Sequence, residues 1–247
     1  MVNNENFVEE ADSLIKRLYI NLTNKCNREC PFCCAFSKPV NDTFLSFNQF
    51  QSIINYHNNL NEPYEVELEG GEPLLHPQFA NIVEFLVQQK LLQTLIIISN
   101  GVLVDKYIDF LYATSQKKKV IMKFSVNYYL LEQDSNLLSQ LEQRIENYPI
   151  ADNWIMCLSI RYRTPKKLDE SWLLQLKAGK LAQYPRNCYA IEYVGRAKEN
   201  KYGGSAVTGE MMTGSCMPII YSCDGVCFNH NFEARRQYEH TILESNQ

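Results

Sequence analysis

Short apolar segments alternate regularly with amphipathic ones along most of the chain. The run Leu95-Ile96-Ile97-Ile98 is the clearest apolar segment, and such runs are typical of parallel strands buried on both faces. Strands are expected at Leu18–Thr23, Glu65–Glu69, Thr94–Ser99, Val120–Asn127, Trp154–Arg161 and Cys188–Val194. Helices are expected at Ser46–His57, Pro77–Gln89, Asp105–Thr114, Ser135–Tyr148 and Asp169–Leu181, with Ser46 and Asp105 as N-caps. The alternation predicts an α/β fold in which six βα units build a parallel sheet.

Composition limits the partners and the compartment. The 247 residues are 45% hydrophobic, enough for one sizeable core and a small appendage. The formal net charge of −4 gives no basic field for nucleic acid or a membrane surface, and no apolar run is long enough to span a bilayer. The polar N-terminus is unlike a secretory signal. Nine cysteines without a signal favour metal ligation in a reducing compartment, so a cytoplasmic protein is expected.

Three cysteines follow the first expected strand at CxxxCxxC spacing: Cys26, Cys30 and Cys33. Three thiolates can hold three corners of a [4Fe-4S] cube, which usually takes four cysteine ligands, so one iron is left open. A structural zinc site or a redox pair is the alternative. Zinc would require a fourth ligand, and Cys34 is too close to Cys33 in sequence to complete a tetrahedron easily.

A second motif, Glu69-Gly70-Gly71-Glu72-Pro73, ends the second expected strand. Two glycines let the backbone approach a ligand without a Cβ in the way, and the Glu72 carboxylate beside them can pair with a cation. The alternative is a Gly-Gly turn that leads into a helix started by proline.

Together with Phe32 directly before Cys33, these two motifs resemble the radical S-adenosylmethionine (radical SAM) superfamily. The resemblance implies an open (β/α)6 partial TIM barrel over residues 15–197, after an N-terminal extension (1–14) and before a C-terminal cysteine-bearing cap (198–247). It also implies that S-adenosylmethionine chelates the open iron and that the reduced cluster cleaves it to a 5′-deoxyadenosyl radical. Gly70, Gly71 and Glu72 match the segment that binds the amino group of this cofactor.

Further cofactor contacts are implied at the other strand ends. Asn100, in a Ser-Asn-Gly segment, lines the site or merely forms a turn. Ser125 and Asn127 end the fourth strand and are expected against the ribose, although two polar residues at a strand exit need no such role. Arg161, or Arg163 two residues later, is expected to reach the ribose or the methionine carboxylate.

The adenine is expected between two segments. Gly195-Arg196-Ala197 resembles the Gly-Arg-Ala that follows the sixth strand in many relatives, and the backbone of Val194 or Tyr193 would then contact the base. Phe32 would shield the base from the other side, as suits an aromatic ring.

The C-terminal cysteines leave three readings open. Cys216, Cys223 and Cys227 lie in an expected β-hairpin with an Asp-Gly turn. They resemble the start of the cysteine-rich extension of radical SAM peptide maturases, which would make them ligands of an auxiliary [4Fe-4S] cluster with Cys188 or His230 as a further ligand. The hairpin is otherwise a structural cap, or one of its thiols, taken as Cys223, donates a hydrogen atom to a substrate radical.

The resemblance implies an enzyme that abstracts hydrogen from its substrate, with the cluster and S-adenosylmethionine as cofactors. Glu192, a charge in an apolar strand, is expected to face this substrate. A peptide or protein substrate is favoured by the C-terminal cysteines. The alternatives are a small molecule of cofactor, nucleoside or sugar biosynthesis, and a non-catalytic Fe–S protein. The implied partners are an electron donor such as flavodoxin or ferredoxin, and a separate peptide-recognition protein.

Overall fold

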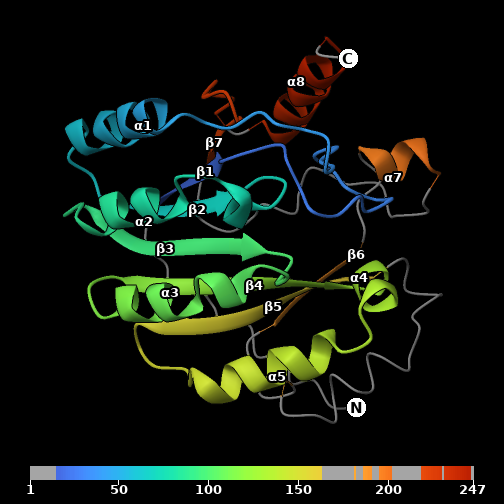
Figure 1. The fold of residues 1–247 in the computed structure, drawn as a ribbon. Helices are drawn as coiled ribbons and strands as arrows, with labels where there is room; N and C mark the ends of the chain where they lie inside the picture. Colours follow the sequence, from blue (N-terminus) through green and yellow to red (C-terminus); the bar gives the residue numbers. More distant parts are fainter. Residues whose placement is uncertain are drawn as a thin grey trace, which may run out of the picture.

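The computed structural model describes residues 15–162, 181, 186–190, 195–201, 218–229 and 231–245 (Figure 1). The N-terminal extension lies outside this part of the chain, and so does the helix expected at 169–181, apart from Leu181.

The strands form one parallel sheet in the order β6-β5-β4-β3-β2-β1-β7. Six of them are the expected strands, with ends displaced by a few residues. The strands are β1 (Lys16–Asn21), β2 (Tyr64–Glu69), β3 (Leu92–Ser99), β4 (Lys119–Asn127), β5 (Trp154–Tyr162), β6 (Arg186–Ala190) and β7 (Pro218–Tyr221). From β1 to β6 each strand is added beside the previous one, so the α/β fold with a parallel sheet is confirmed.

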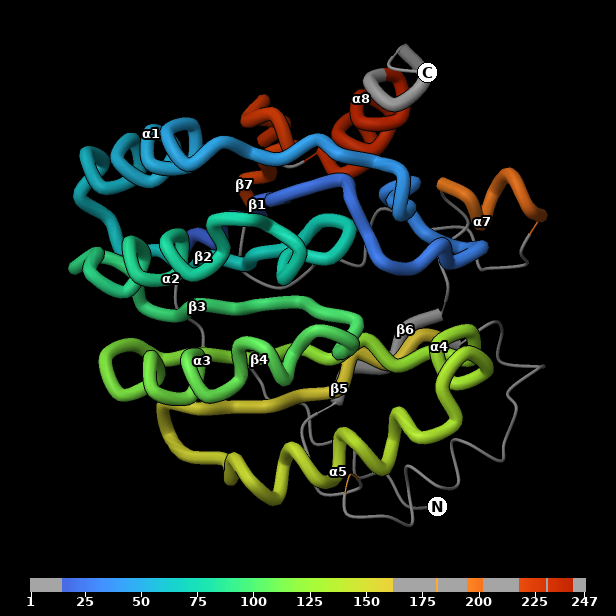
Figure 2. Tube along the Cα trace, viewed as in Figure 1, coloured from blue at the N-terminus to red at the C-terminus, as the bar shows by residue number. Residues whose placement is uncertain are grey.

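The helices that link these strands cover one face of the sheet (Figures 1 and 2). This follows from right-handed crossovers that always add the next strand in the same direction. The linking helices are α1 (Phe47–Asn59), α2 (Phe79–Val87), α3 (Ile108–Ser115), α4 (Tyr128–Gln133) and α5 (Leu137–Asn147), with short 3₁₀ turns η1 (Pro73–Leu75) and η2 (Val104–Lys106). Two further helices are α7 (Arg196–Glu199), which follows β6, and α8 (Phe232–Ser245), which follows β7 and contacts the other face of the sheet through Phe232 on Tyr19.

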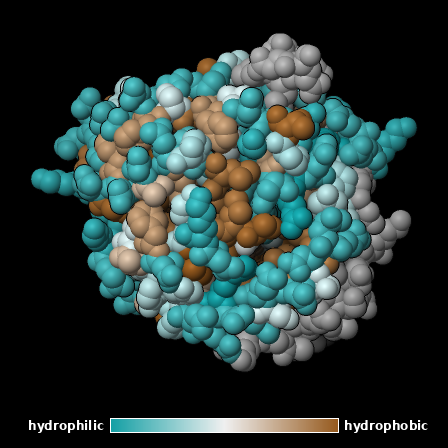
Figure 3. Space-filling model, in the orientation of Figure 1, coloured by the Kyte–Doolittle hydropathy of each residue, from teal (hydrophilic) through white to brown (hydrophobic). Residues whose placement is uncertain are grey.

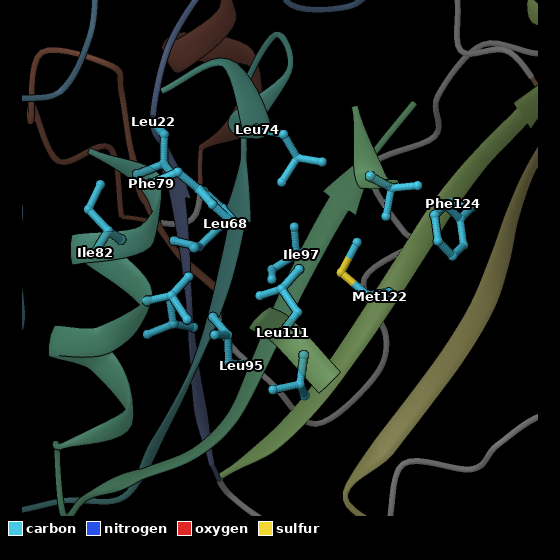
Figure 4. Packing of buried hydrophobic residues seen from close by; sticks show 14 of the residues in the cluster. Leu22, Leu68, Leu74, Phe79, Ile82, Leu95, Ile97, Leu111, Met122 and Phe124 are labelled. Carbon is cyan, nitrogen blue, oxygen red and sulfur yellow. The ribbon is translucent and has the colours of Figure 1, made fainter. Parts of the chain in front are cut away.

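The hydrophobic core lies between the sheet and these helices. Alternate strand residues such as Leu68, Ile97 and Met122 point into it, and Phe79 and Ile82 of α2 belong to the same cluster (Figure 4). The residues between them in each strand face the other way, onto what we call the inner face of the sheet. Polar inner-face residues are therefore separated from the core.

One of the two expected N-caps is confirmed. Ser46 caps α1 in a capping box with Gln49, in which each side chain bonds to the backbone of the other residue. Asp105 lies in η2 instead and pairs with Arg144 of α5 at 2.7 Å, so the N-cap prediction for Asp105 is wrong. The guanidinium of Arg144 is almost buried and needs a counter-charge, which outweighs a cap.

The C-terminal hairpin cap is only partly present. The first arm is β7, which pairs in parallel with β1 at the edge of the sheet, and Tyr221 joins the core. After a turn through Gly225 (φ +87°), the chain returns and makes an antiparallel bridge between Tyr221 and Cys227. The apolar side chains of β7 are thus buried as part of the main sheet, so a separate hairpin cap is not confirmed. The hairpin then leads into α8.

The surface in Figure 3 is largely hydrophilic, with hydrophobic residues gathered near its middle. In the part of the chain that the structure describes, every helix is too short or too polar to cross a membrane.

Candidate functional site

The candidate residues gather beyond the carboxyl ends of the strands, because parallel strands all end on the same side of the sheet (Figure 1). The cysteine loop (residues 24–38) follows β1, and Gly70-Gly71-Glu72 follows β2. Asn100 follows β3, and Asn127 is the last residue of β4. Residues far apart in sequence are thereby assembled into one site.

The cysteine loop carries free thiols at all three positions of the triplet. Cys26 is buried, and Cys30 and Cys33 are half-buried. Burial raises the pKa of Cys26 and of Cys30 to about 12 and also raises the pKa of Cys33. A second effect is the charge of neighbouring thiolates: Cys33 raises the pKa of Cys26, and both Cys26 and Cys33 raise the pKa of Cys30. Such a set needs cationic metal to hold it as thiolates.

The surroundings of these sulfurs fit a cluster. The Arg28 amide donates to Cys26 Sγ at 3.4 Å, and Asn100 Nδ2 lies 3.7 Å from the same sulfur. The amides of Ala35 and Ser37 bond to Cys33 and lower its pKa against the effect of burial. Hydrogen bonds to sulfur are among the features that tune iron–sulfur clusters. The site thus supplies both thiol ligands and N–H donors to them.

Whether several side chains are arranged around one metal ion is a separate question from whether they can hold a cluster. Among the described residues, no group of three or more His, Cys, Asp or Glu side chains is arranged to hold one metal ion. A [4Fe-4S] cube does not require such convergence, because each thiolate binds a different iron.

The two glycines bring the end of β2 against the cysteine loop. A Cβ on Gly71 would overlap the Lys25 carbonyl, and one on Gly70 (φ +141°) would overlap Asn21 and Thr23. The Gly71 amide donates to Thr23 O at 2.7 Å, and the Glu72 amide donates to Lys25 O at 2.9 Å. The glycines therefore allow a close backbone contact with this loop, whereas the sequence suggested close contact with a ligand.

The Glu72 carboxylate is fully buried and joins the ends of β2 and β3. It accepts hydrogen bonds from Ser99 Oγ at 2.9 Å, from the Asn100 amide at 2.8 Å and from the Leu74 amide at 3.2 Å. Burial raises its pKa to about 7, although the three donors act in the opposite direction. A carboxylate has about four acceptor positions, so one remains for a further donor.

Asn100 connects the end of β3 to the cysteine loop. Its Nδ2 donates to Asn27 Oδ1 at 2.7 Å besides its contact with Cys26. Phe32 of the same loop packs on Tyr128, the first residue of α4, with ring centroids 5.4 Å apart. The structure thus places Asn100 beside the cysteine loop and packs Phe32 of that loop against the start of α4.

Ser125, Asn127 and Arg161 share the inner face near the ends of β4 and β5. Ser125 pairs in register with Ser159, and Asn127 with Arg161. Asn127 Oδ1 accepts from the Leu130 amide at 3.0 Å and caps α4, so this oxygen already has a structural role. The neighbouring helix α4 was not expected from the sequence.

Further from the carboxyl ends of the strands, the inner face carries ion pairs that were not predicted from the sequence. Arg17 Nη2 lies 2.8 Å from Glu65, and Lys123 Nζ lies 3.1 Å from Glu67. Burial raises the pKa of Glu67, while Lys123 acts in the opposite direction. The alternation of acidic and apolar residues in β2 was the available signal, because it places the acids on one face.

The described C-terminal cysteines have different surroundings. Cys223 is 1% exposed, and its amide donates to Glu239 Oε1 at 3.3 Å. Cys227 is exposed. Cys216, Glu192, Val194, His230 and the side chain of Cys188 lie outside the described residues.

Three further contacts at the carboxyl ends of the strands were not predicted from the sequence. Arg235 of α8 forms a buried ion pair with Glu69, and Asn21 Nδ2 donates to Glu239 Oε1 at 2.5 Å. Arg196 of α7 bonds to the cysteine loop. The sequence around Arg235 and Arg196 carries no local signal for these contacts, so they were not predicted.

Comparisons with known proteins give the same assignment over part of the chain. Residues 20–121 match the family model described as Radical SAM superfamily. The GTP 3′,8-cyclase of Synechocystis sp. is 33% identical over 109 residues, which are 42% of this chain and 32% of that protein. An S-adenosylmethionine-dependent nucleotide dehydratase of Selenomonas ruminantium is 34% identical over 85 residues, or 34% of this chain and 30% of that protein. The chain thus spans about a third of the length of these relatives.

Two solved structures are also similar. BtrN in complex with AdoMet and 2-DOIA has a TM-score of 0.42 and 14% identity, over 73% of this chain and 71% of that one. Streptococcus suis SuiB bound to its precursor peptide SuiA has a TM-score of 0.40 and 15% identity, over 83% of this chain and 57% of that one.

The family match includes both the cysteine loop and the glycine pair, which the structure brings together through backbone hydrogen bonds. Residues 20–121 therefore carry the match to the radical SAM superfamily, a family of enzymes whose members use a [4Fe-4S] cluster and S-adenosylmethionine as cofactors.

Proposed function

We propose that this chain holds the cluster through Cys26, Cys30 and Cys33 and uses it to start a radical reaction on a bound substrate. The observation that carries the proposal is the grouping of three free thiols in a loop docked on the ends of β2 and β3. When bound, the reduced cluster and S-adenosylmethionine supply a 5′-deoxyadenosyl radical that abstracts a substrate hydrogen.

The protein's own part is to hold these groups in place. The remaining acceptor position of Glu72 is proposed to take the cofactor's amino group, close to the backbone of Gly70 and Gly71. Because that carboxylate is already fixed by three donors, it needs no reorganisation when the cofactor binds.

The ribose and adenine contacts remain as proposed from the sequence, with one refinement. Ser125 offers a hydroxyl on the inner face, and Arg161 a cation at the end of β5. Asn127 is proposed to use its Nδ2, since its Oδ1 caps α4. Phe32, packed on Tyr128, is proposed to shield the adenine, with the backbone of Val194 on the other side.

A small polar molecule is the substrate class that we favour. Ion pairs such as Lys123–Glu67 lie on the inner face and make it polar, as suits a polar ligand better than an apolar one. The names of the two relatives, a GTP cyclase and a nucleotide dehydratase, lie in the same class. A nucleotide or a similarly polar metabolite would suit this lining better than an apolar side chain.

Peptide modification is the second candidate and depends on the C-terminal cysteines. It would require Cys216, Cys223 and Cys227 to hold an auxiliary cluster, or Cys223 to donate a hydrogen atom. Burial of Cys223 raises the pKa of its thiol and so retains the S–H bond that donation needs. Glu192 would then be the substrate-facing charge. A separate peptide-recognition protein would be a partner in that case, and flavodoxin or ferredoxin an electron donor in either case.

The decisive experiment is anaerobic cluster reconstitution followed by assay of 5′-deoxyadenosine after reduction. The wild-type chain should form it from S-adenosylmethionine, and the C30A variant should not. The matched control is C34A, which removes the neighbouring half-buried thiol and should retain the activity. A colourless protein with stoichiometric zinc and no sulfide would overturn the proposal.

The substrate class is tested by the same assay with added compounds. Nucleoside triphosphates should increase 5′-deoxyadenosine formation over the rate without substrate. When the nucleotide carries deuterium on its carbon atoms, that deuterium should appear in the 5′-deoxyadenosine. An increase with cysteine-containing peptides alone would favour the peptide candidate and overturn the small-molecule one.

A further inference from the structure

Arg196, the first residue of α7, bonds to three carbonyl groups of the cysteine loop. Its Nε donates to Cys30 O at 2.9 Å, and its Nη2 donates to Ser37 O at 2.6 Å. Its own amide donates to Cys33 O at 3.0 Å. Two of these carbonyls belong to proposed cluster ligands. A single residue of a distant element thus spans the loop from Cys30 to Ser37.

The neighbours of Arg196 make this contact possible and extend it. Gly195 adopts φ +55°, and a Cβ there would lie 2.6 Å from Cys33 O and 2.8 Å from Cys34 Cα. A side chain at this position would therefore push α7 away from the loop. Asn200 Nδ2 adds a bond to Pro31 O at 2.7 Å. The segment from Gly195 to Asn200 is shaped to lie on the cysteine loop.

The guanidinium also brings a permanent charge to this position. Arginine remains cationic at any pH that the protein tolerates, and its planar group can bond two carbonyls at fixed geometry. Because Nε bonds the backbone of Cys30, the charge lies beside that ligand in a partly buried environment. A nearby cation stabilises the more negative, reduced form of an iron–sulfur cluster.

We propose that Arg196 is a positioning residue that orders the Cys30–Ser37 half of the cysteine loop and makes the bound cluster easier to reduce. The first effect belongs to the polypeptide alone. The second rests on the proposed function, since it needs the cluster. The two effects use different properties of the side chain: ordering depends on its planar fork, and ease of reduction depends on its charge.

The ordering is tested in cluster-free protein by amide hydrogen exchange with mass spectrometry. In R196Q and R196K, amides of residues 30–37 should exchange at least about tenfold faster, since hydrogen bonds from a charged donor are lost. Amides of residues 23–27 should not change, because β2 and β3 hold that half. The control is K198Q, which removes an exposed charge from the same helix. Wild-type exchange of residues 30–37 in both arginine variants would overturn the ordering role.

The electrostatic effect is tested by redox titration of the reconstituted cluster, followed by electron paramagnetic resonance. R196Q should shift the reduction potential to more negative values, whereas R196K should keep most of the wild-type potential because it keeps the charge. K198Q should leave the potential unchanged. Equal potentials in R196Q and K198Q would overturn this half of the proposal.

Failure of the proposed function would give a different result from failure of the proposal for Arg196. A wild-type chain that takes up no cluster would refute that function, while the exchange experiment would still decide the role of Arg196. If R196Q does not fold, R196K alone decides the ordering role by its exchange rates.

Discussion

The cysteine loop and the C-terminal segment both carry cysteines at short spacing, but the fold treats them differently. The loop has little regular structure and is held by bonds from β2, β3 and α7. The C-terminal segment is a strand, a turn and a helix, in which Cys223 is buried and Cys227 is exposed. Cysteine spacing alone does not define a ligand set, because the surrounding elements decide whether the thiols share a site.

The bonds that hold the two regions also differ in kind. The cysteine loop is fixed by hydrogen bonds to its backbone carbonyls, such as those from the Glu72 amide to Lys25 O and from the Arg196 guanidinium to Cys30 O. The C-terminal segment is fixed by buried charge, since Arg235 of α8 pairs with Glu69 of β2. The first arrangement leaves the thiols as the reactive groups of the loop. The second fixes α8 against the carboxyl ends of the strands.

Iron content should separate the two regions most strongly. The triple variant C26A/C30A/C33A should lose all cluster iron, about four atoms per chain, because no thiolate set remains. The double variant C223A/C227A should keep all of it. Iron and acid-labile sulfide after anaerobic reconstitution measure both. About eight irons in the wild type, with four surviving in the triple variant, would place a second cluster at the C-terminal cysteines and erase the contrast.

Removal of a buried charge should destabilise the C-terminal segment next most strongly. R235M leaves the carboxylates of Glu69 and Glu239 without their cation, and we expect a loss of about 3–5 kcal/mol in unfolding free energy. Urea denaturation of the cluster-free protein measures this. K16M, which breaks the exposed pair with Glu62, is the control and should cost less than about 1 kcal/mol. Similar losses in the two variants would mean that buried charge does not hold α8.

A methyl group should disturb the cysteine loop if backbone contact fixes it. G71A places a Cβ on the Lys25 carbonyl, and we expect a cost of about 3 kcal/mol. G101A is the control, since its Cβ would come no closer than 3.5 Å to another group and only its positive φ opposes the change. That control should cost about 1 kcal/mol. If the order of the two costs were reversed, the docking of the loop on Gly71 would not matter for stability.

Mild acid should loosen the C-terminal segment and leave the loop contacts intact. His57 of α1 bonds to the Tyr221 hydroxyl of β7 at 2.8 Å, and burial lowers its pKa to about 4. In the unfolded chain this histidine has a pKa near 6.5, well above its pKa in the folded protein. The unfolded chain therefore binds the proton first, and the folded state loses stability as the pH falls. Between pH 7 and pH 5 the contribution of His57 to stability should fall by about 2 kcal/mol, while the raised pKa of Glu72 acts in the opposite direction in both the wild type and a His57 variant.

The measurement is the unfolding free energy at both pH values in the wild type and in H57Q. The difference in unfolding free energy between the wild type and H57Q should change by about 2 kcal/mol between the two pH values, because the other titrating groups contribute equally to both proteins. An equal loss in both proteins would assign the acid sensitivity to other groups and remove this contact from the comparison.

The elements that sequence predicted well are those set by local pattern. The apolar run of β3 is buried as expected, and the Ser46 capping box starts α1 where Ser-Phe-Asn-Gln indicated. The triplet and the glycine pair were located because their spacing is local. Asp105 shows the limit of this approach, because its partner Arg144 is 39 residues away and no local rule anticipates that pairing.

By itself, the sequence determined the order of the six βα units and the edge of the sheet at which the cysteines lie. These features follow from periodicity and from strand direction, which are properties of neighbouring residues. Tertiary structure alone decided that Gly71 docks the cysteine loop, that Glu72 joins two strand ends and that Arg196 spans Cys30 to Ser37. Such contacts depend on distances between segments separated by tens of residues, and those distances exist only after the sheet has formed.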